Sequence, residues 1–262
     1  MPNYLLTIIG ISIIFIATTL GSAFVFFFKK KEISSRLTRI FLGFASGVML
    51  SAAAFSLIMP SFSADPQFIP NWLIISLSII LGAVFLWGID KITPHLHPNS
   101  QKEEGITENH LSKNAKMFLA VTIHNIPEGL SVGIAFGVAN AMANQSYFYS
   151  ALFLAIGIAL QNIVEGAAVS LPFKSEVKSS AKAFWFGTLS GAVEPVAAIF
   201  GYFVAYRIPA FMPWALSFAG GCMLYVIAEE MIPDLKSNEH DHVGIWSFMF
   251  GFVIMMILDT LG

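Results

Sequence analysis

The sequence predicts an all-α integral membrane protein in which eight helices pack as a polytopic bundle. Three observations support this fold class: 56% of the 262 residues are hydrophobic, only 11% are charged, and the mean hydropathy is +0.74. Ordinary soluble domains carry about 25% charged residues. Helices are expected because an open sheet cannot satisfy its backbone in lipid, and roughly 20 apolar residues cross a hydrocarbon core of about 30 Å.

Eight apolar segments reach the length of a membrane span. We expect the spans at about 4–28, 37–60, 70–90, 117–140, 147–172, 182–206, 210–233 and 243–261. They leave little chain for a soluble domain, so residues 1–262 are expected to form one transmembrane domain. The connection at 91–115 is polar and contains His95, His97, His110, Glu103, Glu104 and Glu108. We expect a solvated cytosolic loop there, with metal sensing as the alternative.

Lys and Arg residues are distributed asymmetrically over the connections. All but one of the 14 basic residues lie in or beside the first, third, fifth and seventh connections, and only Arg207 lies on the other side. Because basic connections between spans stay in the cytosol, these four are expected there. With an even number of spans, both termini are then expected to be extracytoplasmic.

Two further features of the sequence argue against disulfide bonds and against a cleaved secretory signal. Cys222, in the seventh span, is the only cysteine of the chain, which excludes an intrachain disulfide and a thiolate cluster. We expect it to be a small packing residue. The segment from Met1 to Phe28 has no Lys or Arg before its apolar run and is long for a secretory signal, so it is expected to remain as the first span.

Five glutamates fall inside the predicted spans, namely Glu128, Glu165, Glu194, Glu229 and Glu230. An ionisable residue inside a membrane costs at least a few kcal/mol and indicates a functional site. Two spans also carry related phrases, because HNIPEGLSVGIAF begins at His124 and QNIVEGAAVSLPF begins at Gln161. The phrases agree at six of 13 positions, which indicates two helices that present equivalent faces.

Helical geometry places more polar residues beside the two glutamates of these phrases. Residues three and four apart in a helix share a face. The turn before each glutamate is polar: His124 and Asn125 precede Glu128, and Gln161 and Asn162 precede Glu165. If the two helices pack side by side, the two carboxylates can face each other in a cluster of oxygen ligands and one nitrogen ligand.

Two neighbouring carboxylates repel in a low dielectric, and a divalent cation removes that conflict. The ligand types suit Zn²⁺, Fe²⁺ or Mn²⁺, with Cd²⁺ as a mimic, and they give no thiolate preference for Cu(I). Pro127 frees the carbonyl of Ile123, which is tolerated where backbone lines a cavity. The alternative is that the amides and His124 only join helices by hydrogen bonds. The whole constellation, which includes Glu194, favours an ion site.

The phrases HNIPEG, QNIVEG and SGAVEP (Ser190–Pro195), together with eight spans, resemble the ZIP, or Zrt/Irt-like, metal transporters. FASGVMLSAAAFSLIMP and AGGCMLYVIAEEMIP, in the second and seventh spans, are most similar to the bacterial GufA-type branch. The resemblance covers nearly the whole chain. It implies a multi-pass secondary transporter of the bacterial plasma membrane, the inner membrane, that imports divalent metal ions, Zn²⁺ first, into the cytosol.

The resemblance also implies a binuclear metal site midway across the membrane. One position would use His124, Glu128, Gln161 and Glu165, with Met49 of the GVML phrase as a thioether ligand. The second position would use Asn125, Asn162 and Glu194, with Glu128 and Glu165 bridging both ions. Several family members have aspartate where this chain has Asn162, so the second position carries one negative charge fewer.

For several other residues, the expected roles are less specific. Glu229 and Glu230 fall where the family often has a pair near the exit path, so they are expected to be transit residues, or otherwise helix-end charges near the cytosol. His240 and His242 are candidates to receive released ions. On spacing alone, Met49 is a packing methionine. The glycine pairs Gly43/Gly47, Gly133/Gly137 and Gly187/Gly191 are expected to allow close helix packing.

Two other classes of function stay open. An intramembrane metal-dependent hydrolase needs two histidines at i, i+4 with a glutamate beside the first. In the fourth span, however, the i+4 partner of His124 is Glu128, so we expect no enzyme and no cofactor. A non-transporting metal sensor would bind metal without flux. The expected partners are divalent metal ions, the lipid bilayer and a second copy of the chain in a homodimer, and no nucleic acid is expected.

Overall fold

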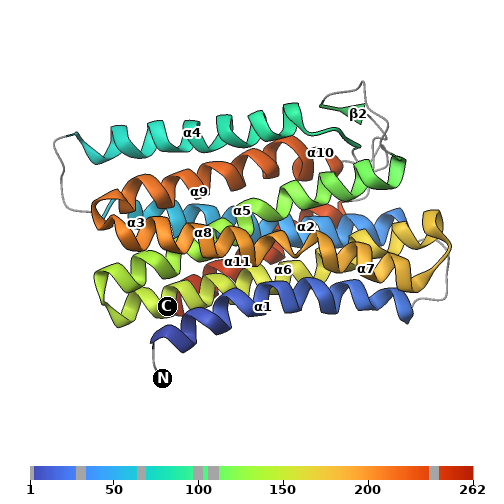
Figure 1. Ribbon diagram of the computed structural model, residues 1–262, viewed down its shortest axis with the longest axis horizontal. Coiled ribbons are helices and arrows are strands. Elements are labelled where there is room, and N and C mark those ends of the chain that lie inside the picture. The colour runs from blue at the N-terminus through green and yellow to red at the C-terminus, as the bar shows by residue number, and fades with distance from the viewer. Residues whose placement is uncertain are drawn as a thin grey trace.

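The computed structural model is a bundle of long helices with both chain termini at the same end (Figure 1). It describes residues 3–27, 34–63, 69–96, 103–105, 112–235 and 242–261. Within these residues, eight helices are long and apolar enough to cross a membrane: Asn3–Phe26, Ser35–Ser61, Asn71–Ile92, Phe118–Met142, Gln145–Lys174, Ser180–Arg207, Met212–Met231 and Val243–Leu261. The predicted all-α membrane fold is confirmed.

Four of the spans are single helices, namely α4 (Asn71–Ile92), α5 (Lys113–Met142), α6 (Gln145–Val177) and α11 (Val243–Leu261). The first span is α1 (Asn3–Ala23) with η1 (Phe24–Phe26), and the second is α2 (Ser35–Ser51) with η2 (Ala52–Ile58) and α3 (Met59–Ser61). The sixth is α7 (Ser180–Ser190) with α8 (Val193–Arg207). After η3 (Pro209–Phe211), the seventh is α9 (Met212–Val226) with η4 (Ile227–Met231) and α10 (Ile232–Leu235).

Local signals explain where α5 and α6 begin and end. Ser112 and Asn144 each accept a hydrogen bond from a backbone N–H in the first turn of the following helix, at 3.3 and 3.0 Å. The two helices end at Ala143 and Lys178, which adopt left-handed backbone conformations with φ of 49° and 52°. Only Ala143 and Asn144 separate α5 from α6, so the two helices are antiparallel neighbours.

Glycines allow α5 and α8 to pack backbone against backbone. A Cβ atom at Gly133 would lie 2.0 Å from the carbonyl oxygen of Ala198, and one at Gly129 would lie 2.2 Å from that of Glu194. These distances are too short for any side chain, so the helices approach closely only because both residues are glycine. The predicted packing role of Gly133 and Gly137 is confirmed. The contact at Gly129 also brings Glu194 beside the HNIPEG turn.

The same kind of contact joins α1 to α6 and α2 to α11. A Cβ atom at Gly166 would lie 2.4 Å from the carbonyl oxygen of Thr18, and one at Gly47 would lie 2.0 Å from that of Phe248. The helix pairs with the most extensive contacts are α5 with α8, α1 with α6, α2 with α11 and α4 with α9. The helices α1, α5, α6, α7 and α8 therefore form one group, which meets α2 and α9 along α5 and α6.

Besides the 3₁₀ turn η1 that ends the first span, three of the predicted spans depart from a continuous α-helix. The sixth is interrupted at Gly191 and Ala192, and the second and seventh contain the π-helical segments η2 and η4. Hydropathy reports the apolar length of a span and not its hydrogen-bond pattern, so these features were not predicted. Their positions matter because π-helical turns often occur at functional sites. Glu194 lies in the first turn of α8, and Glu230 lies within η4.

The 91–115 connection is not wholly a solvated loop. Its strands β1 (His95–Leu96) and β2 (Glu103–Glu104) form a short antiparallel pair, and β1 packs on α5. His95 is fully buried, with Nε2 at 3.0 Å from Asp90 Oδ1 and Nδ1 at 2.8 Å from the Thr93 carbonyl oxygen. His97, Glu108 and His110 lie outside the described residues.

The contacts of His95 predict a pH-dependent contribution to stability. Burial lowers the pKa of His95, but the hydrogen bonds to Asp90 and the Thr93 carbonyl and the negative charges of Asp90 and Glu230 together raise it more, so the net pKa is raised. A raised folded-state pKa contributes stability that is present below the unfolded value of about 6.5 and is lost as pH rises through the folded value. We expect His95→Gln to lower stability by about 1–2 kcal/mol at pH 5.5 and by less at pH 8.5. Thermal unfolding in detergent measures this, and a loss that grows with pH would contradict it.

Candidate metal centre

The side chains predicted as metal ligands come together in the interior of the bundle. Six of them are at most 3% exposed, namely Met49, Asn125, Glu128, Gln161, Asn162 and Glu194. They come from α2, α5, α6 and α8, so the cluster depends on the close helix contacts described above. His124 and Glu165 are partly exposed to a cavity.

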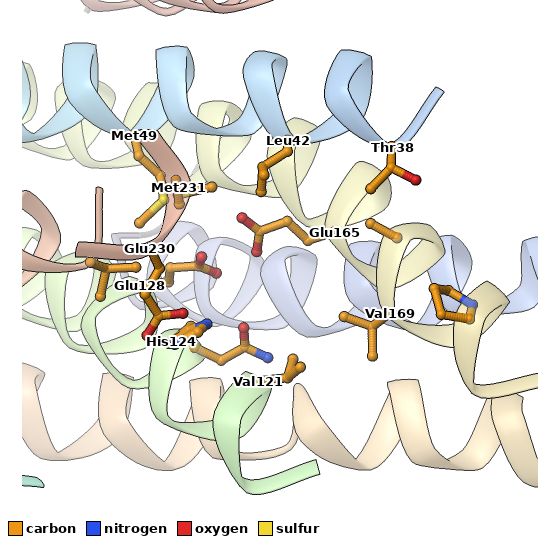
Figure 2. Close-up of a pocket in the computed structure, with 14 residues that line it drawn as sticks. Thr38, Leu42, Met49, Val121, His124, Glu128, Glu165, Val169, Glu230 and Met231 are labelled. Carbon is orange, nitrogen blue, oxygen red and sulfur yellow. Dashed lines mark hydrogen bonds and ion pairs between the residues drawn. The ribbon is translucent and has the colours of Figure 1, made fainter. Parts of the chain in front are cut away.

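That cavity has a volume of about 180 Å³, and its polar lining includes His124, Asn125, Glu128, Glu165 and Glu230. Figure 2 shows the labelled carboxylates and His124 pointing toward a common space, with Met49 and Met231 beside them. The lining continues to Thr38, in the first turn of α2, and to Pro172, near the end of α6. The cavity thus leads from the carboxylates toward the helix ends that adjoin the basic connections.

Glu128 is in contact with the polar residues of the neighbouring helix α6. Gln161 Nε2 donates a hydrogen bond to Glu128 Oε1 at 2.5 Å. The Glu165 carboxyl group is in side-chain contact with both Glu128 and Gln161. The two related phrases therefore lie side by side with their glutamates together, as the helical spacing predicted.

Glu194 occupies a second part of the cluster, together with a residue that the sequence did not indicate. Thr18 Oγ1, from α1, donates a hydrogen bond to Glu194 Oε1 at 2.7 Å. Asn162 Nδ2 donates in turn to Thr18 Oγ1 at 3.1 Å. Thr18 was missed because a threonine in an apolar span is common, and no sequence pattern connects it with Glu194.

The residues expected along the exit path have different environments. Glu230 Oε1 forms an ion pair and hydrogen bond with His124 Nε2, so Glu230 belongs to the same cluster. Glu229 is exposed, and so is His242 at the start of the last span. His240 lies outside the described residues. The sequence predicted both Glu230 and His124 as polar site residues, but not the contact between them.

The contrast between adjacent glutamates gives a matched pair of variants. We expect Glu230→Gln to reduce metal uptake about tenfold or more, because it removes the charged partner of a candidate ligand. Glu229→Gln should change uptake less, since its side chain is exposed. Initial uptake rates in reconstituted vesicles test this, and equal losses in the two variants would be the contrary result.

The side chains are hydrogen-bonded mainly to one another. Among the residues that the structure describes, no group of three His, Cys, Asp or Glu side chains converges as a ready-made metal site. Four buried oxygen atoms of the cluster nevertheless have no hydrogen-bond donor: Glu128 Oε2, Gln161 Oε1, Asn162 Oδ1 and Glu194 Oε2. An unsatisfied buried acceptor costs about 1–3 kcal/mol. Oxygen atoms of this kind are suitable ligands for a divalent cation.

The fold and this cluster define a class, that of polytopic membrane proteins with a buried site of carboxylates and amides between their spans. A family model described as ZIP Zinc transporter matches residues 4–118 and 115–259. The chain belongs to this ZIP family. It is a multi-pass membrane protein.

Three relatives illustrate the range of the similarity. The chain is 40% identical to the zinc transporter ZIP11 of Homo sapiens over 146 residues, which are 56% of this chain but only 42% of that protein. It is 31% identical to ZIP11 of Bos taurus over a gapped alignment of 324 positions that covers 93% of each chain. It is 33% identical to the zinc transporter GufA of Myxococcus xanthus over 185 residues, 71% of this chain and 70% of that one. The predicted family is therefore confirmed.

Proposed function

We propose that this chain is a secondary transporter that carries divalent metal cations, zinc first, into the cytosol through the cluster between α5, α6 and α8. The observation that carries the proposal is the group of four buried carboxylate and amide oxygens without donors, inside a membrane-spanning core. A cation satisfies such oxygens and also removes the repulsion between Glu128 and Glu165. The names of the relatives support zinc as the first candidate cargo.

The first metal position is proposed at the wall of the cavity. His124, Glu128, Gln161 and Glu165 would supply one imidazole nitrogen, the oxygens of two carboxylates and one amide oxygen. Met49 lines the same cavity and is 1% exposed, which supports its place as a thioether neighbour. A cation entering this position has to replace the hydrogen bond from Gln161 to Glu128, so the amide must turn its oxygen toward the ion.

The second metal position is proposed deeper in the bundle. Asn125, Asn162 and Glu194 would complete it, and Glu128 and Glu165 would bridge the two ions. Its oxygens are fully buried, and the cavity lining includes Asn125 but neither Asn162 nor Glu194. With Asn162 in place of a carboxylate, we expect this position to bind metal more weakly than the first.

The shape of the cavity supports release toward the cytosol. Its lining runs from Glu128 and Glu165 to Thr38 and Pro172, toward the ends that carry the basic connections. By the distribution of Lys and Arg, those ends face the cytosol and both termini face away from it. Glu230 lies along this route beside His124, so it is the favoured transit residue. Alternating exposure of a site near the midplane is common among secondary transporters.

The whole chain is proposed to be one transporter domain. It is surrounded by lipid, since large apolar side chains are exposed on its spans. The homodimer stays a prediction, as do Fe²⁺, Mn²⁺ and Cd²⁺ as alternative cargo and the absence of enzymatic activity.

Uptake of radioactive Zn²⁺ into proteoliposomes tests the proposed function. We expect saturable flux with the wild-type protein and none with protein-free vesicles. Asn140→Ala is the matched control, because it removes a partly buried α5 amide that donates a hydrogen bond to the Tyr202 hydroxyl, several turns from Glu128. It should keep its flux. Metal binding without flux in a folded wild-type protein would instead favour a sensor.

A further inference from the structure

Thr18 links three helices at the second part of the cluster. Its hydroxyl lies on α1, donates to Glu194 Oε1 on α8 and accepts from Asn162 Nδ2 on α6, at 2.7 and 3.1 Å. The residue is 4% exposed, so no bulk water competes for these bonds. A single hydroxyl group therefore contacts two of the three residues that distinguish the second metal position from the first, Asn162 and Glu194.

Thr18 and the backbone of α1 together decide which way the Asn162 amide faces. The Thr18 hydroxyl gives its single hydrogen to Glu194, so Oγ1 can only accept a hydrogen bond from the amide nitrogen of Asn162. Asn162 Nδ2 also donates to the carbonyl oxygen of Ile14, at 3.4 Å. That carbonyl can only accept, and so the amide nitrogen must face α1 while Oδ1 faces away from it. Oδ1 has no donor and Asn162 is 1% exposed. The result is a buried amide oxygen that α1 turns away from itself.

Thr18 has a similar effect on Glu194. It bonds Oε1, while Oε2 remains without a donor in the buried cluster. Two glycines make the arrangement possible. A Cβ atom at Gly191 would lie 2.7 Å from Thr18 Cγ2 and 3.1 Å from Glu194 Oε1, and one at Gly166 would lie 2.4 Å from the Thr18 carbonyl oxygen. The glycines thus leave the space in which Thr18 reaches both partners.

We propose that Thr18 is the positioning residue of the second metal position, because its hydroxyl holds Asn162 Oδ1 and Glu194 Oε2 ready to bind a divalent cation. This inference rests on the proposed function. Thr18 itself does not bind the ion. A neutral amide needs such orientation more than a carboxylate does, because only one of its two terminal atoms is a metal ligand.

Equilibrium binding of radioactive Zn²⁺ to the purified full chain in detergent tests the role of Thr18. Wild type and Thr18→Ser, which keeps the hydroxyl, should each bind two ions. Thr18→Val has a similar shape without the hydroxyl, and Thr18→Ala is a second variant. Both should keep the first ion with unchanged affinity and bind the second about 10–100-fold more weakly, the usual effect of losing a group that orients a metal ligand. Retention of the first ion shows that these variants are folded.

A second comparison separates orientation from packing. In an Asn162→Asp background, the carboxylate presents an oxygen to the site whichever way it turns. Thr18→Val should therefore weaken the binding of the second ion by a smaller factor than it does in the wild type. The same factor in both backgrounds would overturn the orienting role. The orienting role would also be overturned if Thr18→Val bound two ions with unchanged affinity, or if Thr18→Val and Thr18→Ala both bound no ion.

The binding experiment also distinguishes this inference from the proposed function. A wild-type chain that binds a single ion and transports it would overturn the role of Thr18 and leave the first position intact. A wild-type chain that binds no zinc would overturn both. Two ions bound by the wild type, with selective weakening of one in Thr18→Val and rescue in Thr18→Ser, would support both.

Discussion

Replacing Glu128 with glutamine is expected to reduce zinc uptake at least about 100-fold, the upper range of the effect of losing only an outer-shell partner. Glu128 is 1% exposed and is in contact with Gln161 and Glu165. It would serve both metal positions, so the loss of its charge should weaken both. Glutamine keeps the size of the side chain, and the fold should therefore survive.

Initial rates of radioactive Zn²⁺ uptake into proteoliposomes, at matched protein content, measure this effect. Glu165→Gln should behave similarly because Glu165 is the other bridging carboxylate. Asn140→Ala should retain wild-type rates. If Glu128→Gln transported zinc at half the wild-type rate or faster, the ion would have to cross the protein by another route.

Gly133→Ala is expected to destabilise the protein by about 1–3 kcal/mol or more, the usual range for overpacking. The new Cβ atom would lie 2.0 Å from the Ala198 carbonyl oxygen and 2.6 Å from its Cα, and backbone atoms cannot move aside as the end of a flexible side chain can. The helices α5 and α8 would have to separate. Because Glu194 lies on α8, uptake should fall as well.

Gly88→Ala is the matched control for this prediction. Gly88 is also inside a membrane-spanning helix, α4, but an added Cβ atom there meets no atom within 4 Å. Alanine should be neutral or stabilise the helix by up to about 1 kcal/mol. Thermal unfolding in detergent compares the two variants, and equal melting temperatures would contradict the backbone packing of α5 on α8.

The membrane fold was predictable because apolar length is written directly in the sequence. All eight predicted spans overlap helices of the structure, and glycine pairs such as Gly133/Gly137 were correctly predicted to pack. The break at Gly191 and the π-helical segments η2 and η4 were not predicted. They depend on backbone hydrogen bonds, which leave the hydropathy of a span unchanged.

The cluster was predictable where its residues share one helix or one repeated phrase. The spacing of His124 and Glu128, and of Gln161 and Glu165, placed them correctly on facing turns. Contacts between distant segments were not predictable. The pairs formed by Thr18 with Glu194 and by His124 with Glu230 join residues separated by 176 and 106 positions, and only the packing of the helices brings them together.

X-ray absorption at the zinc K-edge, recorded on the purified chain with one zinc ion bound, tests most directly whether the ion lies between α5 and α6. The proposed site predicts oxygen and nitrogen ligands at about 2.0–2.2 Å with the outer-shell scattering of one imidazole. That imidazole signal should disappear in His124→Ala, and the spectrum of Asn140→Ala should match the wild type. Identical spectra from the wild type and His124→Ala would place the ion elsewhere and contradict the proposed site.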